Sequence, residues 1–458
     1  MDTKVLRQKI LDLAIHGKLV PQDPNDEPAS VLLERIRAEK ERLIKEGKIK
    51  KGKKSAKTSD KPHYPFELPK GWCFTNIGEL LINRDGERKP VSSAIRSKQS
   101  NKIYDYYGAA GIIDKIDDYL FDEKLLLIGE DGANLLSKRK NNAFFAKGKY
   151  WVNNHAHVLD ATDKKLLEYV AIVINAIKLD DYITGSAQPK LSQDNLNKIP
   201  IALPPLSEQK RIMEAIIHWS LLIEQIEQNK IDLQASIKQA KSKVLDLAIH
   251  GKLVPQDPND EPAIELLKRI NPKAEIITDN GHYQKLPVGW CEVWLGEIFN
   301  HNTGKALNTS NTEGIMRKYL TTSNVYWNTF DFTTVKQMYF KNNELDKCSI
   351  TKGDLLVCEG GDIGRAAIWN YDYNICIQNH LHRLRPKING LCVSFYYYVF
   401  NYLKVNNMIG GKGIGLLGLS SNALHKLHVP FPPLAEQTRI AAKIEELFHQ
   451  LDMIEESL

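Results

Sequence analysis

Two histidine pairs and two carboxylates are the side chains best suited to chemistry in this 458-residue chain. The pairs lie in NHAHVL (154–159) and NHLHRL (379–384), which contain His155, His157, His380 and His382. Alternate side chains on a strand share a face, so each pair could face one ligand, zinc included. Glu130 in GEDG and Glu359 in CEGGD occupy matching places after apolar runs and could add oxygen ligands.

The further ligands that zinc needs are not found near these residues. The six cysteines form no CxxC pair and have no histidine at zinc-finger spacing, so we predict no metal site and no bound cofactor. We expect each NHxH pair to lie on a polar strand that faces the working surface of a domain. Buried histidines with satisfied hydrogen bonds are the alternative, and we interpret the two acids as turn residues.

The familiar catalytic motifs are absent from the sequence. It has no Walker A motif, no GxGxxG that opens a helix after a strand, and no GxSxG. An amino-methyltransferase needs an Asn/Asp-Pro-Pro-aromatic stretch, whereas the double prolines here lie in LPPL and FPPL. We interpret the glycine-rich GGKGIGLLG (410–418) as a loop. A non-catalytic protein is therefore expected, and an enzyme of unrecognised type that uses the histidine pairs and paired acids stays as an alternative.

The composition is that of an ordinary globular protein, with 42% hydrophobic and 26% charged residues. No run of eighteen apolar residues could span a membrane, and free cysteines suit a reducing compartment, so we expect a cytoplasmic protein. The net charge of +6 is too small to identify a partner. A run of eight lysines between Lys45 and Lys61 is typical of a solvated linker, with phosphate contact as the alternative.

The elements that must position these residues occur twice, because the chain is a tandem duplication. DLAIHGKLVPQDPNDEPA is found without a change at 12–29 and at 246–263. The other repeated stretches, in the same order, are LPKGWCFTNIGEL (68–80) with LPVGWCEVWLGEI (286–298), the NHxH motifs, and LPPLSEQKRIMEAI (203–216) with FPPLAEQTRIAAKI (431–444). Residues 81–150 and 299–375 are almost unrelated, so each half has a variable region between similar flanks.

A long helix is predicted over 208–250, at the junction of the two halves. Its apolar spacing alternates between four and three, which is the heptad pattern of a coiled coil, at Ile212, Ile216, Trp219, Ile223, Ile226, Lys230, Leu233, Ile237, Ala240, Val244 and Leu247. Gly251 and Pro255 end it after about 43 residues, or roughly 60 Å. The same pattern continues through 440–458 and 3–13, so we expect the two chain ends together to pair antiparallel with the long helix.

The predicted fold class is α+β, with two mixed α/β domains joined by a long antiparallel two-helix coiled coil in a pseudo-two-fold repeat. Strands are expected at 124–131 and 354–361, and late apolar helices at 166–177 and 393–403. The expected divisions are a helical segment with a basic linker (1–61), the first variable domain (62–206), a central region with the long helix (207–281), the second variable domain (282–434) and a terminal helix (435–458).

This pattern of LPxGW entry, PPLxEQxxI exit and repeated flanks resembles the specificity subunit of type I restriction–modification systems over essentially the whole chain. The resemblance implies a non-catalytic subunit whose two variable domains are target-recognition domains, each reading half of a split double-stranded DNA site. It also implies that the helices act as a spacer and as the docking core for two methyltransferase subunits, with restriction subunits as further partners. S-adenosylmethionine, ATP and magnesium would belong to those partners.

Under this interpretation, the identical segment supplies the same docking surface twice, with Lys18, Asp23, Lys252 and Asp257 as candidate docking residues; gene conversion or a requirement of folding are the alternatives. DNA contacts are expected from polar, basic and aromatic residues of the variable regions. The candidates are Lys89, Arg96, Lys98, Lys102, Tyr104, Tyr107, Lys138, Arg139, Lys140, Ser186, Gln188, Lys190, Lys305, Arg317, Lys318, Asn324, Arg365 and Lys412. The competing hypothesis is a coiled-coil adaptor that bridges two partner proteins, with DNA binding incidental.

Overall fold

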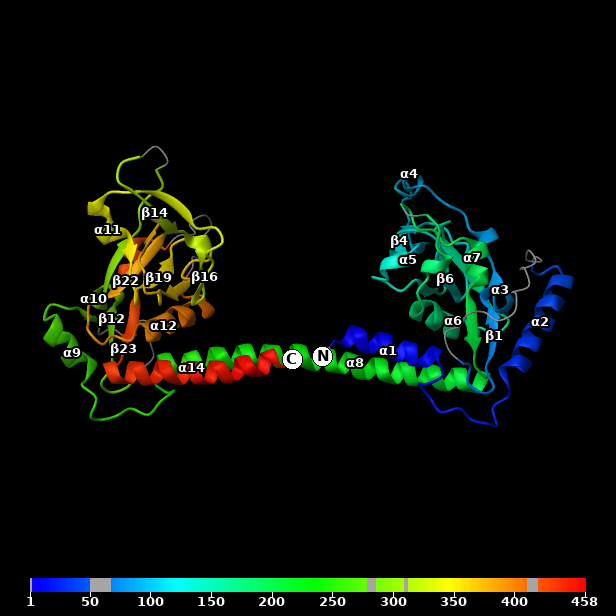
Figure 1. Ribbon diagram of the computed structural model, residues 1–458, viewed down its shortest axis with the longest axis horizontal. Helices are drawn as coiled ribbons and strands as arrows, with labels where there is room; N and C mark the ends of the chain where they lie inside the picture. Colours follow the sequence, from blue (N-terminus) through cyan, green and yellow to red (C-terminus); the bar gives the residue numbers. More distant parts are fainter. Residues whose placement is uncertain (1, 50–66, 186, 278–285, 309–311, 410–418) are drawn as a thin grey trace. The chain divides into compact units, whose positions relative to one another are not determined.

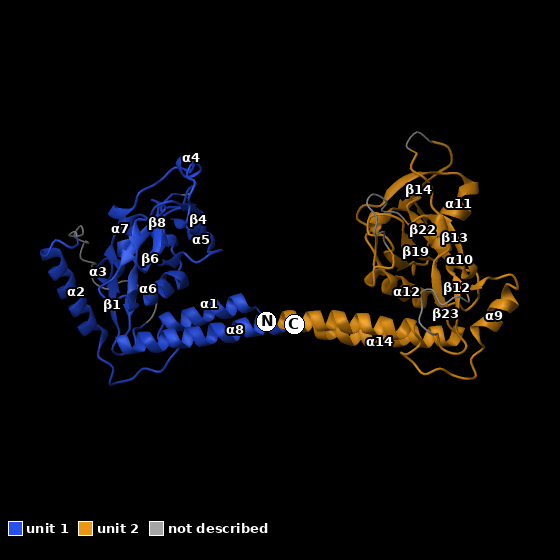
Figure 2. Ribbon diagram, turned by 180° about the vertical axis from the view of Figure 1, so that it is seen from behind, with its two compact units in different colours: residues 1–229 blue, residues 230–458 orange. Residues whose placement is uncertain are grey.

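The computed structural model describes residues 2–49, 67–185, 187–277, 286–308, 312–409 and 419–458 (Figure 1). The chain divides into two compact units, Met1–Asn229 and Lys230–Leu458, coloured separately in Figure 2. The division falls within one helix, so each unit contains one variable region with its flanks.

The described residues of unit 1 form two four-stranded sheets and one two-stranded sheet. The strand orders are β2-β9-β6-β7, β4-β3-β8-β5 and β1-β10. The bounds are β1 Cys73–Asn76, β2 Ile82–Asn83, β3 Tyr104–Gly108, β4 Gly111–Ile116, β5 Phe121–Asp122, β6 Leu125–Gly129, β7 Ala143–Ala146, β8 Lys149–Val152, β9 Ala156–Asp160 and β10 Pro200–Leu203. β1 begins at the cysteine of the GWC motif and β10 ends directly before the PPL motif, so their antiparallel pairing brings the entry and exit of the variable region together.

Unit 2 repeats the strand orders of unit 1, with β11 and the β15–β16 pair in addition. Its four-stranded sheets have the orders β13-β22-β19-β20 and β17-β14-β21-β18, while β12 and β23 pair as β1 and β10 do. The parallel pair β3–β8 of unit 1 has its counterpart in β14–β21. The bounds are β11 Ile276–Ile277, β12 Cys291–Trp294, β13 Phe299–Thr303, β14 Ile315–Leu320, β15 Val325–Tyr326, β16 Thr329–Phe330, β17 Lys336–Phe340, β18 Ser349–Ile350, β19 Leu355–Cys358, β20 Ala366–Ile368, β21 Ile375–Ile377, β22 Leu381–Pro386 and β23 His428–Phe431.

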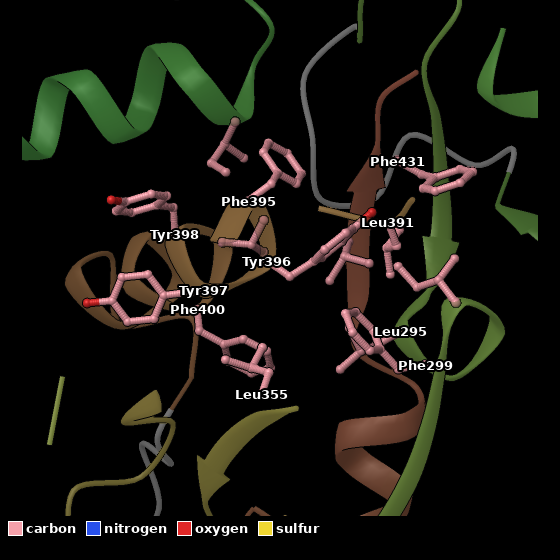
Figure 3. Packing of buried hydrophobic residues seen from close by; sticks show 14 of the residues in the cluster. Leu295, Phe299, Leu355, Leu391, Phe395, Tyr396, Tyr397, Tyr398, Phe400 and Phe431 are labelled. Carbon is pink, nitrogen blue, oxygen red and sulfur yellow. The ribbon is translucent and has the colours of Figure 1, made fainter. Parts of the chain in front are cut away.

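Each unit buries one strongly apolar helix against its sheets, and both were predicted from the sequence. These are α6 (Lys165–Ala176) in unit 1 and α12 (Val393–Val405) in unit 2. Figure 3 shows Tyr396 of α12 extending toward Phe299 and Phe431, and its ring centroid lies 5.2 Å from that of Phe299. The predicted buried strands are confirmed as β6 and β19, whose residues are entirely buried. Fully burying one such large side chain contributes about 1.5–3 kcal/mol, so these helices anchor the sheets from one side.

The other helices lie in the flanks or in turns that connect strands. They are α1 Thr3–Ile15, α2 Ala29–Lys45, α3 Ile77–Leu80, η1 Asp85–Glu87, α4 Ser93–Arg96, α5 Asn134–Ser137, η2 Asp180–Tyr182, α7 Gln193–Lys198, α9 Ala263–Ile270, α10 Leu295–Ile298, η3 Thr322–Asn324, α11 Asn342–Cys348, α13 Ser421–His425 and α14 Leu434–Glu456. Within the described ranges, no helix combines the length and the hydropathy that crossing a bilayer requires.

The predicted long helix exists as α8, Leu206–Ile249, with 44 residues. It ends as the sequence predicts, because Gly251 has a φ of +64°, a conformation that favours glycine. The amide of Lys252 donates to the carbonyl of Leu247 at 2.7 Å, which completes the helix end. Gly17 (φ +64°) ends α1 in the same way, so the identical segment begins with the same helix stop in both units.

A second helix lies along α8 in each unit. In unit 1 it is α1, where Arg7 Nη2 lies 3.1 Å from Glu227 Oε2. In unit 2 it is α14, where Lys241 Nζ lies 2.5 Å from Asp452 Oδ1 (Figure 2). The predicted heptad positions on α8 are buried only in part. Ile212, Ile223 and Ile237 are buried, whereas Trp219, Ile226 and Leu233 stay 40–43% exposed.

Candidate nucleic-acid interface

The repeated flanks of unit 1 meet in one hydrogen-bonded group of side chains, here called the interlock: Gln22, Asp26, Trp72, Glu208 and Arg211. The indole Nε1 of Trp72 donates to Glu208 Oε2 at 2.9 Å, and Gln22 Nε2 donates to Glu208 Oε1 at 3.2 Å. Arg211 Nη2 pairs with Asp26 Oδ2 at 2.6 Å. The interlock thus ties the VPQDPND, LPxGW and PPLxEQ stretches to one another.

Unit 2 contains the same interlock, formed by Gln256, Asp260, Trp290, Glu436 and Arg439. Trp290 Nε1 donates to Glu436 Oε2 at 2.8 Å, Gln256 Nε2 donates to Glu436 Oε1 at 3.2 Å, and Arg439 Nη2 lies 2.6 Å from Asp260 Oδ2. In both units burial raises the pKa of the glutamate and outweighs the opposing hydrogen bonds. The repeated segment therefore has a structural role in each unit.

The four candidate docking residues lie on the surface beside the interlocks. Lys18 and Lys252 are exposed, one residue after the glycines that end the helices. Asp23 and Asp257 are exposed as well, and the Oδ1 atom of each accepts a 2.9 Å hydrogen bond from a backbone amide two residues later. The two units thus present the same exposed charges, which a repeated partner could contact.

The two histidines of NHAH do not share a face, so the expectation that each NHxH pair faces one working surface is wrong. Strand β9 begins only at Ala156. His155 therefore lies in the preceding turn, exposed, with Nδ1 2.7 Å from Asp131 Oδ2. The side chain of His157 is 1% exposed, with Nδ1 2.6 Å from Asp85 Oδ2 and Nε2 2.8 Å from the carbonyl of Leu191. His157 instead confirms the alternative, a buried histidine with satisfied hydrogen bonds.

Charged groups surround His157 in unit 1. Asp85, Glu130 and His157 offer ligand atoms within 4.8 Å of one another. Arg88 Nη1 already lies 2.7 Å from Glu130 Oε2, and its Nη2 lies 3.3 Å from Asp85 Oδ2. Burial would raise the pKa of Asp85, but the hydrogen bond and charge of His157, with Arg88, hold it below the usual value. A cation would have to displace Arg88, so this cluster fits an ion-pair network better than a metal site.

In unit 2 a second histidine takes the place that Asp85 has in unit 1. His301 Nε2 lies 2.8 Å from His382 Nδ1, and His382 Nε2 lies 2.7 Å from the carbonyl of Leu419. Burial, then the neighbouring His382 and His425, lower the pKa of His301 to about 4. Burial also lowers the pKa of His382. His380 is exposed, as His155 is. Glu130 and Glu359 both follow a strand directly, as predicted from their matching positions.

Several candidate DNA contacts of unit 1 are engaged in contacts within the unit. Asp114 binds both Arg96 Nε and Lys102 Nζ, each at 2.8 Å, and the guanidinium of Arg96 lies 4.2 Å from the ring centroid of Tyr106. Lys138 Nζ donates to the carbonyl of Asn175 at 3.2 Å. Burial lowers the pKa of Lys138. Because Arg96, Lys102 and Lys138 are held by contacts within the unit, they would contact DNA in these positions and not as freely rotating side chains.

The aromatic candidates of unit 1 belong to strand β3. Tyr104 is half-buried with its ring centroid 5.2 Å from that of Tyr119. Tyr107 is half-buried and stacks on Phe144 with centroids 6.1 Å apart. Five other candidates are exposed, namely Lys89, Lys98, Arg139, Lys140 and Gln188. Lys190 is exposed too, with Nζ 3.4 Å from Glu130 Oε1. The predicted residues are thus spread over several loops.

In unit 2 the candidates divide in the same manner. Arg317 and Lys318 are exposed on β14. Lys305 Nζ lies 2.6 Å from Glu344 Oε2, and Arg365 Nη2 donates to the carbonyl of Thr322 at 2.6 Å. Asn324 is fully buried, and its amide bonds to neighbouring loop groups, so it supports the loop and is not presented to solvent. Ser186, Lys412, the loop 410–418 and most of the lysine run lie outside the described residues.

Asp85, Arg88 and His301 are not among the candidate residues predicted from the sequence. Their side chains contact residues far along the chain: Asp85 contacts His157, and His301 contacts His382. Their own neighbourhoods contain no repeated motif, since they lie in the regions that differ between the two halves. Only the pairing of β2 with β9 and of β13 with β22 brings these partners together.

The sequence is similar to one family of known proteins over most of its length. Residues 69–237 and 287–458 match the family model of the type I restriction modification DNA specificity domain. The EcoAI specificity subunit of Escherichia coli is 28% identical over 97% of this chain and 88% of its own length. The EcoEI specificity subunit of the same species is 26% identical over 99% of this chain and 90% of its own length.

The fold has a counterpart among solved structures. The crystal structure of the HsdS subunit from Thermoanaerobacter tengcongensis superimposes with a TM-score of 0.53 at 16% identity, covering 86% of this chain and 93% of that one. At this identity the likeness concerns the fold alone. Both matched regions contain the tryptophan and the glutamate that pair in each interlock, Trp72 with Glu208 and Trp290 with Glu436. With two copies of the domain over most of its length, this chain belongs to the type I restriction–modification DNA specificity family, as a specificity subunit.

Proposed function

We propose that each unit reads one half of a split, non-palindromic DNA site. The observation that carries this proposal is that the two units share one sheet topology but carry different side chains on matching strands. β3 has the sequence YDYYG, whereas its counterpart β14 has IMRKYL with Arg317 and Lys318 exposed. Since base edges are recognised by individual donors and acceptors, different side chains on one scaffold select different bases.

The proposed spacer between the half-sites is α8 with the two helices that lie along it. The described contacts of α1 with α8 extend to Glu227, and those of α14 begin at Lys230, whose Nζ donates to the carbonyl of Leu458 at 2.6 Å. Taken as one rod, α1 and α14 would form the antiparallel partner of α8 that the heptad pattern predicts. Half-site spacing follows protein geometry in DNA-binding proteins that carry two readers.

The proposed partners are double-stranded DNA and two methyltransferase subunits, with restriction subunits joining them. The same charged segment occurs beside both interlocks, which suits two identical partners on one asymmetric chain. S-adenosylmethionine, ATP and magnesium would enter with those partners. Reversing the charges of Lys18, Asp23, Lys252 and Asp257 together should reduce the number of methyltransferase subunits bound, measured by native mass spectrometry. Unchanged stoichiometry would reject this docking role.

Inserting one heptad into α8 between Asn229 and Lys230 tests the spacer proposal. The insertion point lies between the contact of Arg7 with Glu227 and the contact of Lys230 with Leu458. Seven residues add about 10 Å of helix, or roughly three base pairs at 3.4 Å each. The methylated motif, read by methylome sequencing, should keep both half-sites and gain about three unread base pairs.

The matched control places the same heptad between Pro272 and Lys273, both exposed and outside the helices. This control should leave the motif unchanged. If complexes that contain the α8 insertion methylate the parental motif at the parental spacing, α8 does not set the distance between the half-sites. If the wild-type chain produces no split motif, the reading proposal itself fails.

A further inference from the structure

We infer that His157 and His382 are positioning residues for sequence reading, and that each fixes the backbone of one leucine from inside its unit. In unit 1 this leucine is Leu191, at the end of the loop that carries the exposed Gln188 and Lys190, and in unit 2 it is Leu419. The inference rests on the proposed reading function and goes beyond it by naming buried residues that touch no DNA. Three hydrogen bonds in each unit support the inference: one from the histidine Nε2, one from the leucine amide and one from the amide of the paired glutamate.

In unit 1 both peptide groups of Leu191 are held by the sheet. The amide of Leu191 donates to the carbonyl of Glu130 at 2.7 Å, and the Leu191 carbonyl accepts the 2.8 Å hydrogen bond from His157 Nε2. The leucine side chain is fully buried. Ahead of it, Thr184 and Lys190 exchange two backbone hydrogen bonds of 2.9 and 2.8 Å, and the carbonyl of Pro189 accepts from Gly132 at 2.9 Å. The loop that carries exposed Gln188 and Lys190 thus has a fixed base.

Unit 2 holds Leu419 by the same two bonds. The amide of Leu419 donates to the carbonyl of Glu359 at 2.8 Å, and its carbonyl accepts from His382 Nε2 at 2.7 Å. The amides of Glu130 and Glu359 in turn donate to the carbonyls of His155 and His380. The NHxH motif and the paired acids therefore form one anchor that occurs in both units.

The side chain at Nδ1 of the buried histidine differs between the units: it is Asp85 in unit 1 and His301 in unit 2. The ring of His157 lies between two oxygen groups, the carboxylate of Asp85 at Nδ1 and the carbonyl of Leu191 at Nε2. The ring of His382 donates to a carbonyl and accepts from His301, so both rings are neutral. The carboxylate at Nδ1 is not retained in unit 2, whereas the hydrogen bond between Nε2 and a leucine carbonyl is. We therefore assign the shared role to this single hydrogen bond.

A reading loop must keep its side chains within a fraction of an ångström of the base edges, because hydrogen bonds weaken steeply with distance and angle. The loop in unit 1 has exposed residues between Thr184 and Lys190, so its position depends on its two ends. The Nε2 bond fixes one end from inside the unit. Its loss should therefore impair discrimination between bases more than attraction to phosphates.

The test uses four single variants in the chain assembled with its methyltransferase subunits: His157→Ala, His157→Gln, His382→Ala and His382→Gln. Binding is measured by competition with DNA duplexes that carry single base-pair changes in either half-site, after methylome sequencing has identified the site. His157→Ala should reduce discrimination about ten-fold in one half-site, and His382→Ala about ten-fold in the other. Glutamine, whose Nε2 can donate to the same carbonyl, should restore much of the discrimination.

His155→Ala and His380→Ala are the matched controls, because these histidines lie two residues earlier in the same motif and are exposed. They should bind as the wild type does. Affinity for scrambled DNA should stay within about two-fold in all variants, since it depends on phosphate contacts. Full discrimination in a folded His157→Ala variant would overturn the inference, as would an equal loss in both half-sites or a glutamine variant no better than alanine. A wild-type complex that does not discriminate would instead refute the proposed function.

Discussion

In unit 1 the ring of His157 lies between Asp85 and the end of a loop, whereas in unit 2 the ring of His382 lies between His301 and the equivalent position. The interlocks, by contrast, have the same five residue types, with matching distances that agree within 0.1 Å. The anchor belongs to the variable sheets and the interlock to the repeated flanks. The two units thus tolerate a change of charge inside a domain but keep the joint at its base unchanged.

Removal of the interlock tryptophans should give the largest effect and tests whether the two joints are equivalent. Trp72 and Trp290 are 7% and 6% exposed, and each donates to a buried glutamate. Replacing either by alanine leaves a cavity and a glutamate oxygen without its donor, so we expect a loss of about 3 kcal/mol or more in each unit. Urea unfolding of both variants, monitored by circular dichroism, measures this loss.

Trp219→Ala is the control, because Trp219 is 43% exposed on α8 and should change stability much less. Equal losses of unfolding free energy for Trp72→Ala and Trp290→Ala would show that the same contacts stabilise both units to the same extent. A loss confined to one unit would show that the repeated joint is needed on one side only.

Acidification should have a smaller effect and separate the two anchors. The pKa of His301 is about 4, and that of His382 is lowered as well, while free histidine titrates near pH 6.5. The folded unit 2 therefore binds these protons less readily than the unfolded chain, and stability is lost as the pH falls from about 6.5 toward 4. At pH 5 the loss should reach about 2 kcal/mol. The titratable side chains that act on this pair are Glu359, His380 and His425.

Asp85, which takes the place of His301 in unit 1, should not contribute a loss of stability in this range. The pKa of Asp85 lies below its usual value of about 3.9, so the stability that it contributes is lost only as the pH falls below that value toward the folded pKa. Hydrogen exchange of β9 and β22 at pH 8 and pH 5, corrected for intrinsic rates, compares the two units. His301→Asp should make unit 2 respond less. Equal protection of β22 at both pH values would contradict the assigned cause.

Much of the architecture could be predicted because its signals are local. The heptad spacing and Gly251 place α8 within two residues of its observed ends, and the apolar stretches give α6, α12, β6 and β19. The candidate site was predicted less well. Basic residues were selected by type, but Asn324 is buried and Lys305 is paired with Glu344, because exposure depends on neighbours that are distant in sequence.

The sequence by itself determined the duplication, the repeated motifs and the helix that joins the halves, since repetition, periodicity and helix ends are written in adjacent residues. The tertiary structure alone decided that Trp72 meets Glu208 and Gln22, that one histidine of each pair is buried, and that Asp85 in one unit is replaced by His301 in the other. These contacts depend on where strands begin and on which strands pair. A shift of one residue would turn each side chain to the opposite face of its sheet.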